Sequence, residues 1–365
     1  MEMKAAIFRK PHEPLTIESV EIDKPSGREV LVRTAATGVC HSDLHVVDGQ
    51  GRWPLDRPIV LGHEGAGVVE SVGADVSTLS PGDHVVACLS GFCGSCAQCL
   101  AGHPNLCVGG LVTRPDAAPP RLSQKGEPLR QFIGISSYAE RMLLHENSVV
   151  KIDSDLPLDR AALVGCGVLT GVGAALRTSG LEAGQTVAVF GCGGVGLAIV
   201  QGARIGGARQ IIGVDVFDGK LEMAKRVGAT HVVNSAQDDP VKAVRALTQG
   251  AGVDHAFEAV GNATLVRQAI ESLAIRGTAT IVGVLPPDAT IEFPWMAIRP
   301  ECRVQTSRMG SNRFRLDIPL YLEFYRQGRL LLDEMVTRRG RLEDINDAFR
   351  AMKAGEVART VLTFN

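Results

Sequence analysis

Four cysteines lie within the fifteen residues of CGSCAQCLAGHPNLC, namely Cys93, Cys96, Cys99 and Cys107. Their C-x-x-C steps let neighbouring thiolates turn back onto one ion, and four sulfurs close the tetrahedral shell of Zn²⁺. Such a shell leaves no position for water or substrate, so we predict that this loop holds a structural zinc. Unrelated surface thiols are disfavoured by the clustering, and a thioredoxin-like redox pair by the lack of a βαβ context.

Sulfur and imidazole groups recur in three other stretches, GVCHSDLH, LGHEGAGVVESVG and VGCGVLTG. These stretches contribute Cys40, His63 and Cys166, which are side chains of the kind that bind zinc. Composition alone does not join the three. For each of them, an ordinary core cysteine or a capped histidine is the alternative.

A third pattern, in TVAVFGCGGVGLAIV, gives Gly191, Gly193 and Gly196 the spacing G-x-G-x-x-G. The motif follows an expected strand and opens an expected helix, and Asp215 ends the next strand nineteen residues after Gly196. The glycines permit a tight turn and the close approach of a pyrophosphate to the helix N-terminus, while the carboxylate binds ribose hydroxyls. In this context a glycine turn without functional meaning is disfavoured, and we predict a dinucleotide site.

The elements that must position these residues change in character near Cys166. Before it, residues 4–90 contain short strands broken by Gly and Pro, and a long Pro-rich loop precedes the strands in SYAERMLLH and SVVKI. After it, strands and helices alternate from TVAVFG to TATIVGV, a pattern typical of a doubly wound parallel sheet. From about residue 309 we expect two amphipathic helices and a closing strand in RTVLTFN.

The bulk composition is that of an ordinary α/β protein. The chain has 365 residues, 45% of them hydrophobic, with 41 glycines and a formal net charge of -2. The length favours two domains, and the balanced charge disfavours nucleic acid and anionic membranes as partners. The segment MEMKAAIFRKPHEPL lacks the apolar core of a signal peptide, and no run reaches the roughly 18 apolar residues of a membrane span. We therefore expect a cytoplasmic protein, in which the nine cysteines favour metal over disulfides.

Taken together, these motifs make the chain resemble the zinc-dependent medium-chain alcohol dehydrogenases over essentially its whole length, from KAAIF to RTVLTF. The resemblance implies an α/β fold with a GroES-like β-rich catalytic domain at 1–167, a doubly wound Rossmann coenzyme domain at 168–308 and a C-terminal completion of the catalytic domain at 309–365. It also implies reversible hydride transfer between an alcohol and NAD, giving an aldehyde or ketone, and two zinc ions per chain.

The resemblance further implies that Cys40, His63 and Cys166 hold a catalytic zinc whose fourth position takes water or the substrate oxygen. Zinc then acts as a Lewis acid on the alcohol or carbonyl, while the nicotinamide takes the hydride. The expected catalytic residues around the zinc have four different roles. Glu64 is the carboxylate behind the metal that approaches it transiently, and Asp43 is the acid that orients the ligand histidine. Ser42 hydrogen-bonds the alkoxide, and His45 is the outer end of a proton relay.

For the cofactor, the resemblance implies cationic contacts to the pyrophosphate, packing against the nicotinamide and ribose contacts near Asp215. The expected cofactor-binding residues are His41, Thr170, Gly191, Gly193, Gly194, Val195, Gly196, Asp215, Lys220, Val282, Val284 and Arg359. The carboxylate of Asp215 favours NAD over NADP, because a 2′-phosphate would lie against its negative charge. The expected substrate pocket is lined by Leu89, Leu106, Phe132 and Val284, with Trp53 as a further candidate, and core packing is the alternative for each.

Two features distinguish the chain from parts of the family. The stretch GQGRWPLDRP makes the segment between Cys40 and His63 longer than expected of the liver-type enzymes. The resemblance therefore does not define the entrance of the substrate pocket. The glutathione-dependent formaldehyde branch usually has an arginine soon after the last structural cysteine, where CVGGLVTR has Leu111, with Arg114 further on. A glutathione adduct is therefore the disfavoured alternative substrate.

Two other functions remain as alternatives. A zinc-free quinone reductase is disfavoured because all three expected zinc ligands are present. A non-enzymatic zinc-binding structural protein is disfavoured because Ser42 and His45 accompany those ligands. We expect a homodimer, from the resemblance of the loop 108–131 to that of dimeric relatives, with a tetramer as the alternative.

Overall fold

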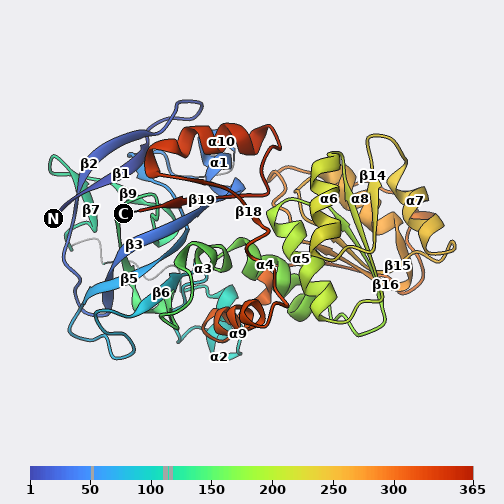
Figure 1. Ribbon diagram of the computed structural model, residues 1–365, viewed down its shortest axis with the longest axis horizontal. Helices are drawn as coiled ribbons and strands as arrows, with labels where there is room; N and C mark the ends of the chain where they lie inside the picture. The colour runs from blue at the N-terminus through green and yellow to red at the C-terminus, as the bar shows by residue number, and fades with distance from the viewer. Residues whose placement is uncertain (51–52, 110–113, 115–117, 365) are drawn as a thin grey trace. The chain divides into compact units, whose positions relative to one another are not determined.

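The computed structural model of the protein describes residues 1–50, 53–109, 114 and 118–364 (Figure 1). Contacts within the chain divide it into two units. The first comprises Met1–Cys166, Arg313–Phe324 and Val336–Asn365, and the second comprises Gly167–Asn312 and Tyr325–Met335. The structure therefore divides the expected C-terminal segment 309–365 between the two units.

Residues 325–335 belong to the second unit because polar side chains of helix α5 (Gly194–Ile205) bind their backbone. The buried amide of Gln201 accepts a hydrogen bond from the Leu331 N–H at 2.6 Å and donates one to the Leu331 carbonyl at 3.4 Å. Arg204 donates to the carbonyl of Arg329 at 2.6 Å. Hydrophobic periodicity does not reveal side-chain to backbone hydrogen bonds of this kind. The sequence pattern therefore did not predict that residues 325–335 belong to the second unit.

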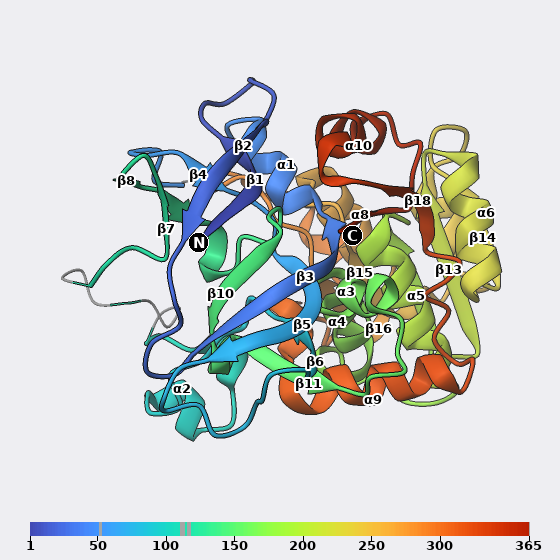
Figure 2. The same cartoon turned by 60° about the vertical axis from the view of Figure 1, so that its left-hand side comes forward.

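The first unit is built on two sheets of short strands. One runs in the order β8-β7-β2-β1-β4-β9, and the other in the order β11-β6-β5-β3-β19-β18, with β10 also paired to β3. Figure 2 shows β3 lying beside β5 and β10. The strands are β1 Glu2–Phe8, β2 Thr16–Ile22, β3 Glu29–Val39, β4 Ile59–Val60, β5 Glu64–Val72, β6 His84–Ala87, β7 Leu122–Gln124, β8 Glu127–Pro128, β9 Arg130–Gln131, β10 Arg141–His145, β11 Val149–Ile152, β18 Val336–Gly340 and β19 Arg359–Thr363.

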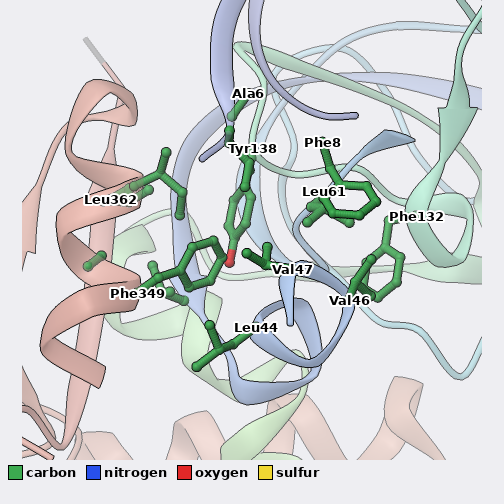
Figure 3. Packing of buried hydrophobic residues seen from close by; sticks show 14 of the residues in the cluster. Ala6, Phe8, Leu44, Val46, Val47, Leu61, Phe132, Tyr138, Phe349 and Leu362 are labelled. Atoms are coloured by element: carbon green, nitrogen blue, oxygen red, sulfur yellow. The ribbon is translucent and has the colours of Figure 1, made fainter. Parts of the chain in front are cut away.

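Helices close one core of this unit, and the last strand completes its sheet. Strand β19 pairs antiparallel with β3, so the end of the chain lies beside the strand that leads to Cys40. In the core shown in Figure 3, Phe8 of β1 packs in one cluster with Leu44 of α1 and Phe349 of α10. The helices are α1 His41–Val47, α2 Ala97–Leu100, α3 Leu158–Val164, α9 Phe314–Arg326 and α10 Ile345–Lys353.

The second unit confirms the predicted doubly wound sheet. All neighbouring strands are parallel, in the order β14-β13-β12-β15-β16-β17. The direction of winding reverses between β12 and β15, and ligands of such sheets bind at the carboxyl ends of the strands there. The strands are β12 Thr186–Phe190, β13 Gln210–Asp215, β14 His231–Asn234, β15 Val253–Glu258, β16 Leu273–Ile281 and β17 Arg303–Thr306, and the helices are α4 Gly167–Gly173, α5, α6 Asp218–Val227, α7 Pro240–Leu247 and α8 Ala263–Glu271.

No single helix in the described part of the chain is long and apolar enough to cross a bilayer. One bent pair, Leu158–Val164 with Gly167–Thr178, meets the requirements by length and composition alone.

Gly38 lies where three strands of the first unit meet. It is paired with Glu64 of β5 on one side and with Val361 of β19 on the other. Glu64 forms a buried ion pair with Arg359 across this position. A Cβ at Gly38 would collide with the carboxylate of Glu64, so the glycine leaves room for the ion pair.

Replacing Gly38 with alanine should lower the free energy of unfolding by about 2 kcal/mol or more, because the methyl group displaces a fully buried carboxylate from its cation. Urea unfolding followed by circular dichroism measures the effect. Gly219→Ala is the matched control, since a Cβ there meets no atom within 4 Å, and it should change stability by no more than about 1 kcal/mol. Equal effects of the two substitutions would contradict this account.

Candidate functional site

The structure brings Cys40, His63, Glu64 and Cys166 together in the first unit. One ligand atom from each lies within 4.8 Å of the others, and all four residues are buried. Cys40 follows the end of β3, His63 directly precedes β5, and Cys166 follows α3. Three segments that are distant in the sequence thus supply two sulfurs, an imidazole and a carboxylate to one place, as zinc coordination requires.

The orientation of His63 is set by Asp43. Nδ1 of the imidazole lies 3.1 Å from Oδ2 of Asp43, and both side chains are fully buried. Oδ1 of Asp43 accepts a hydrogen bond from the Gly62 N–H at 2.8 Å. Both ring nitrogens of His63 are buried without a hydrogen bond among the described residues, but Nδ1 faces the Asp43 carboxylate and Nε2 does not have such a contact. This nitrogen is therefore the one left to bind a metal, with the carboxylate fixing the ring from behind.

One of the two thiols at this place favours the thiolate form that metals bind, whereas its hydrogen bond to Cys40, together with burial, raises the pKa of the Cys166 thiol well above its usual range. A hydrogen bond from Cys166 lowers the pKa of Cys40 well below its usual range although burial opposes it, and the imidazole of His63 acts in the same direction. Burial raises the pKa of Glu64 to about 7, against the effect of the Arg359 guanidinium. The donor set and its charges fit a zinc ion.

The four cysteines of the loop 93–107 also come together. Their sulfur atoms lie within 4.8 Å of one another, with 3.5 Å between Cys96 and Cys99, 4.0 Å between Cys93 and Cys99, and 3.9 Å between Cys96 and Cys107. A tetrahedron with Zn–S bonds of about 2.3 Å has edges of about 3.8 Å. Helix α2 and a 3-10 turn at Pro104–Leu106 shape the loop. The geometry therefore fits a closed zinc site.

In the second unit, the glycine motif lies between β12 and α5. Gly191 has a φ of 95°, which favours glycine, and a Cβ at Gly196 would lie 1.8 Å from the Gly191 carbonyl. A Cβ at Gly193 would meet no atom within 4 Å, so this face of the turn is open to a ligand. Gly194 and Val195 form the first turn of α5. The turn has the shape that a pyrophosphate needs.

Asp215 ends β13 beside this turn. Its Oδ2 accepts a hydrogen bond from the Cys192 N–H at 2.8 Å, and its Oδ1 accepts from Val216 at 2.8 Å and Phe217 at 3.1 Å. A carboxylate has about four acceptor positions. The same side chain can therefore hold the glycine turn and still accept from a ribose. Lys220 follows on α6, with its ammonium 4.8 Å from the centre of the Phe217 ring.

The remaining expected residues lie in different surroundings. Phe132 is buried with its ring edge-on to His63 at 5.7 Å, and Trp53 packs against Phe132 at 4.8 Å. Ser42 and His45 lie half-buried on α1, and Leu106 is 41% exposed on the turn of the cysteine loop. The others are placed as follows: His41 exposed at the start of α1, Leu89 half-buried after β6, Thr170 buried on α4, Val282 half-buried and Val284 exposed after β16, and Arg359 buried at the start of β19.

Sequence reasoning missed one residue of the first cluster. The hydroxyl of Tyr138 donates a hydrogen bond to Oδ2 of Asp43 at 3.0 Å. The stretch SYAERMLLH predicts only strand structure, and an isolated tyrosine carries no ligand spacing that could have drawn attention to it. Leu111 lies outside the described residues, while Arg114 is held by Asp23 at 2.5 Å and Glu29 at 2.6 Å.

Comparisons with known proteins agree with these features. The alcohol dehydrogenase GroES-like domain matches residues 26–154, and the zinc-binding dehydrogenase family matches residues 194–325. The chain is 38% identical over 367 residues to an alcohol dehydrogenase class-3 of Zea mays, covering 98% of this chain and 96% of that protein. It is also 38% identical over 369 residues to an S-(hydroxymethyl)glutathione dehydrogenase of Saccharomyces cerevisiae, covering 98% and 95%.

Solved structures give the same result. An alcohol dehydrogenase zinc-binding domain protein from Burkholderia ambifaria matches with a TM-score of 0.93 and 38% identity, covering 100% of this chain and 99% of that one. The benzyl alcohol dehydrogenase of Acinetobacter calcoaceticus matches with a TM-score of 0.92 and 32% identity over 100% of both chains. The predicted GroES-like and Rossmann fold is confirmed. The chain belongs to the zinc-dependent medium-chain alcohol dehydrogenase family.

Proposed function

We propose that this alcohol dehydrogenase transfers hydride reversibly between a small alcohol and NAD at a zinc held by Cys40, His63 and Cys166. The observation that carries the proposal is the buried Nε2 of His63, which lacks a hydrogen-bond partner within the described residues and belongs to a cluster with two thiols. When bound there, zinc supplies Lewis-acid polarisation of the substrate oxygen. Two thiolates and a neutral imidazole balance its two positive charges.

The residues on α1 offer a path for the proton of the alcohol. Ser42 follows Cys40 closely, with its Oγ 4.0 Å from the Cys40 sulfur. His45 lies one turn further along the helix and is half-buried, so its imidazole can exchange a proton with solvent. Ser42 therefore binds the alcohol oxygen and His45 carries the proton outward, in a general-base role suited to an imidazole.

The substrate proposed is a neutral alcohol, with a glutathione adduct as the second candidate. The class-3 and S-(hydroxymethyl)glutathione relatives support the adduct. Against it, Arg114 is engaged by Asp23 and Glu29 and so is a poor partner for a further carboxylate. The benzyl alcohol dehydrogenase relative and the aromatic pair Phe132 and Trp53 beside His63 support an apolar alcohol.

The two clusters predict two zinc ions with different roles. Cys166→Ser should abolish oxidation of benzyl alcohol by NAD and remove one zinc while preserving the fold, because it acts only at the buried cluster. Cys99→Ser should instead remove the other zinc and lower thermal stability first, because a closed site contributes to folding. Elemental analysis, melting curves and NADH absorbance measure these effects.

The wild-type protein is the reference for both variants. It should hold two zinc ions per chain and oxidise benzyl alcohol with a higher kcat/KM than S-(hydroxymethyl)glutathione. Active protein with one zinc or none would refute the assignment of the two clusters. A zinc-loaded protein that oxidises neither substrate would count against the proposed reaction.

The proposed cofactor is NAD, and Asp215 is the residue that selects it. Its carboxylate ends β13, where a 2′-phosphate would meet negative charge in a confined site. Asp215→Ser should therefore reduce the preference for NAD over NADP by roughly a hundredfold. The ratio of kcat/KM for the two cofactors measures it.

Asp218→Ser provides the control for Asp215→Ser. Asp218 is an exposed carboxylate three residues further on, and it accepts a hydrogen bond from Asn234 at 2.7 Å. Removing it takes away a nearby negative charge without touching the end of β13, so the preference should change by less than about threefold. A wild-type protein that prefers NADP would show that Asp215 does not have this role.

A homodimer is proposed from the edge of the second unit's sheet. Among the described strands, β17 pairs only with β16, which leaves its other backbone edge open. Val304 on this strand is 54% exposed, and the nearby chain segment exposes Trp295 by 81% and Met296 by 84%. Edge strands with apolar neighbours pair readily with a second copy about a two-fold axis.

The proposed location is a reducing compartment such as the cytoplasm. All nine cysteines lie in the described part of the chain, and none of them forms a disulfide there, which supports this location.

Replacing both Trp295 and Met296 with glutamate should convert the dimer to a monomer of 38.7 kDa, because four buried charges in a two-fold interface are strongly unfavourable. Light scattering after gel filtration measures the mass. Leu316→Glu is the control, since Leu316 is also exposed, at 62%, but lies on α9. A dimer that survives the double substitution would place the interface elsewhere.

A further inference from the structure

Tyr138 places a single hydroxyl inside an apolar core. Its side chain is fully buried, and its ring packs edge-on against Phe349 with 6.3 Å between ring centres. Figure 3 shows its oxygen among the carbon side chains of Phe349, Leu44 and Val47. Packing alone would be served by a phenylalanine. A buried hydroxyl needs a hydrogen-bond partner, and here the partner is Asp43.

The hydroxyl is one of three polar groups that lie against one carboxylate. Oδ2 of Asp43 lies 3.0 Å from the Tyr138 oxygen and 3.1 Å from Nδ1 of His63, while Oδ1 accepts from the Gly62 N–H at 2.8 Å. Burial, reinforced by the charge of Asp43, raises the pKa of Tyr138 well above its usual value. The phenol therefore stays protonated and acts as the donor.

The backbone keeps the tyrosine in register with the segment that carries the histidine. The Tyr138 N–H donates to the Leu61 carbonyl at 3.0 Å, and the Ser137 N–H donates to the Gly62 carbonyl at 3.0 Å. Gly62 has a φ of 90°, and a Cβ there would lie 2.6 Å from the tyrosine ring. The ring and residues 61–63 are thus built against each other, so the hydroxyl has a defined position relative to His63.

We propose that Tyr138 is a positioning residue for the catalytic zinc, acting through Asp43 on His63. This inference rests on the proposed zinc site, and extends its hydrogen-bond network by one residue. Without the hydroxyl, a fully buried carboxylate loses one of the two hydrogen bonds that hold it within the described residues. It can then rotate, which weakens its hold on the imidazole. The zinc should consequently leave its ligands more easily.

The test compares zinc release from the purified, zinc-loaded enzymes. Tyr138→Phe keeps the ring and should release the catalytic zinc to the chelator 4-(2-pyridylazo)resorcinol about tenfold faster than wild type. The kinetic phase of zinc release that is missing from Cys166→Ser is the one that belongs to the catalytic zinc. Release of the four-cysteine zinc should be unchanged, which separates positioning from general destabilisation. Tyr321→Phe is the control, since Tyr321 is another fully buried tyrosine of the first unit, on α9.

The outcomes distinguish this inference from the function on which it rests. Equal catalytic-phase rates in wild type, Tyr138→Phe and Tyr321→Phe would overturn the role of the hydroxyl while leaving the zinc site intact. Acceleration of both zinc phases in Tyr138→Phe would also overturn it, since the effect would then be one on folding. If wild type and Cys166→Ser release zinc with the same phases, the proposed zinc site itself would be overturned.

Discussion

Two thiols and an imidazole buried together impose the constraint on which the first unit depends. Each group is costly to remove from water unless it has a partner, and a thiolate is the most costly of them. The first unit meets this constraint by ending β3 at Cys40, starting β5 just after His63 and turning the chain at Cys166 after α3. The ligand atoms thereby lie within 4.8 Å of one another, where one divalent ion can satisfy all of them.

The same constraint accounts for the polar groups that surround the cluster. Asp43 is tolerated in the interior because the Tyr138 hydroxyl and the Gly62 amide donate to it and the His63 imidazole lies 3.1 Å from it. Glu64 is tolerated because the guanidinium of Arg359 lies against it. Glycines occur where these side chains need room, so the backbone, the carboxylates and the ligands form one connected arrangement.

In the second unit, the glycine turn between β12 and α5 leaves space for a ligand. Gly191 takes a backbone conformation that other residues rarely adopt, and Gly196 allows the helix α5 to pack closely on the turn. Gly193, by contrast, faces open space. Asp215 supports the turn through the Cys192 amide and has acceptor positions left for a ribose. One carboxylate thus serves both the structure of the turn and the proposed choice of cofactor.

The family, the two-part fold and the ligand candidates could be predicted from the sequence because they depend on short-range spacing. A C-x-x-C step or a G-x-G-x-x-G turn closes within a few residues, and alternating strands and helices define a parallel sheet without knowledge of distant contacts. The resemblance then placed Cys40, His63 and Cys166 in one site, and the structure brings them together.

Other features were decided only by the tertiary structure, because they depend on which buried polar group finds which partner. Tyr138 reaches Asp43 across a separation of 95 residues, and Gln201 holds Leu331 across 130. Arg114 pairs with Glu29 of β3, 85 residues away, although its place after the cysteine loop had raised the question of a substrate contact. Hydrophobic periodicity and local spacing carry no information on such pairs, since they form only when folding excludes water from both partners.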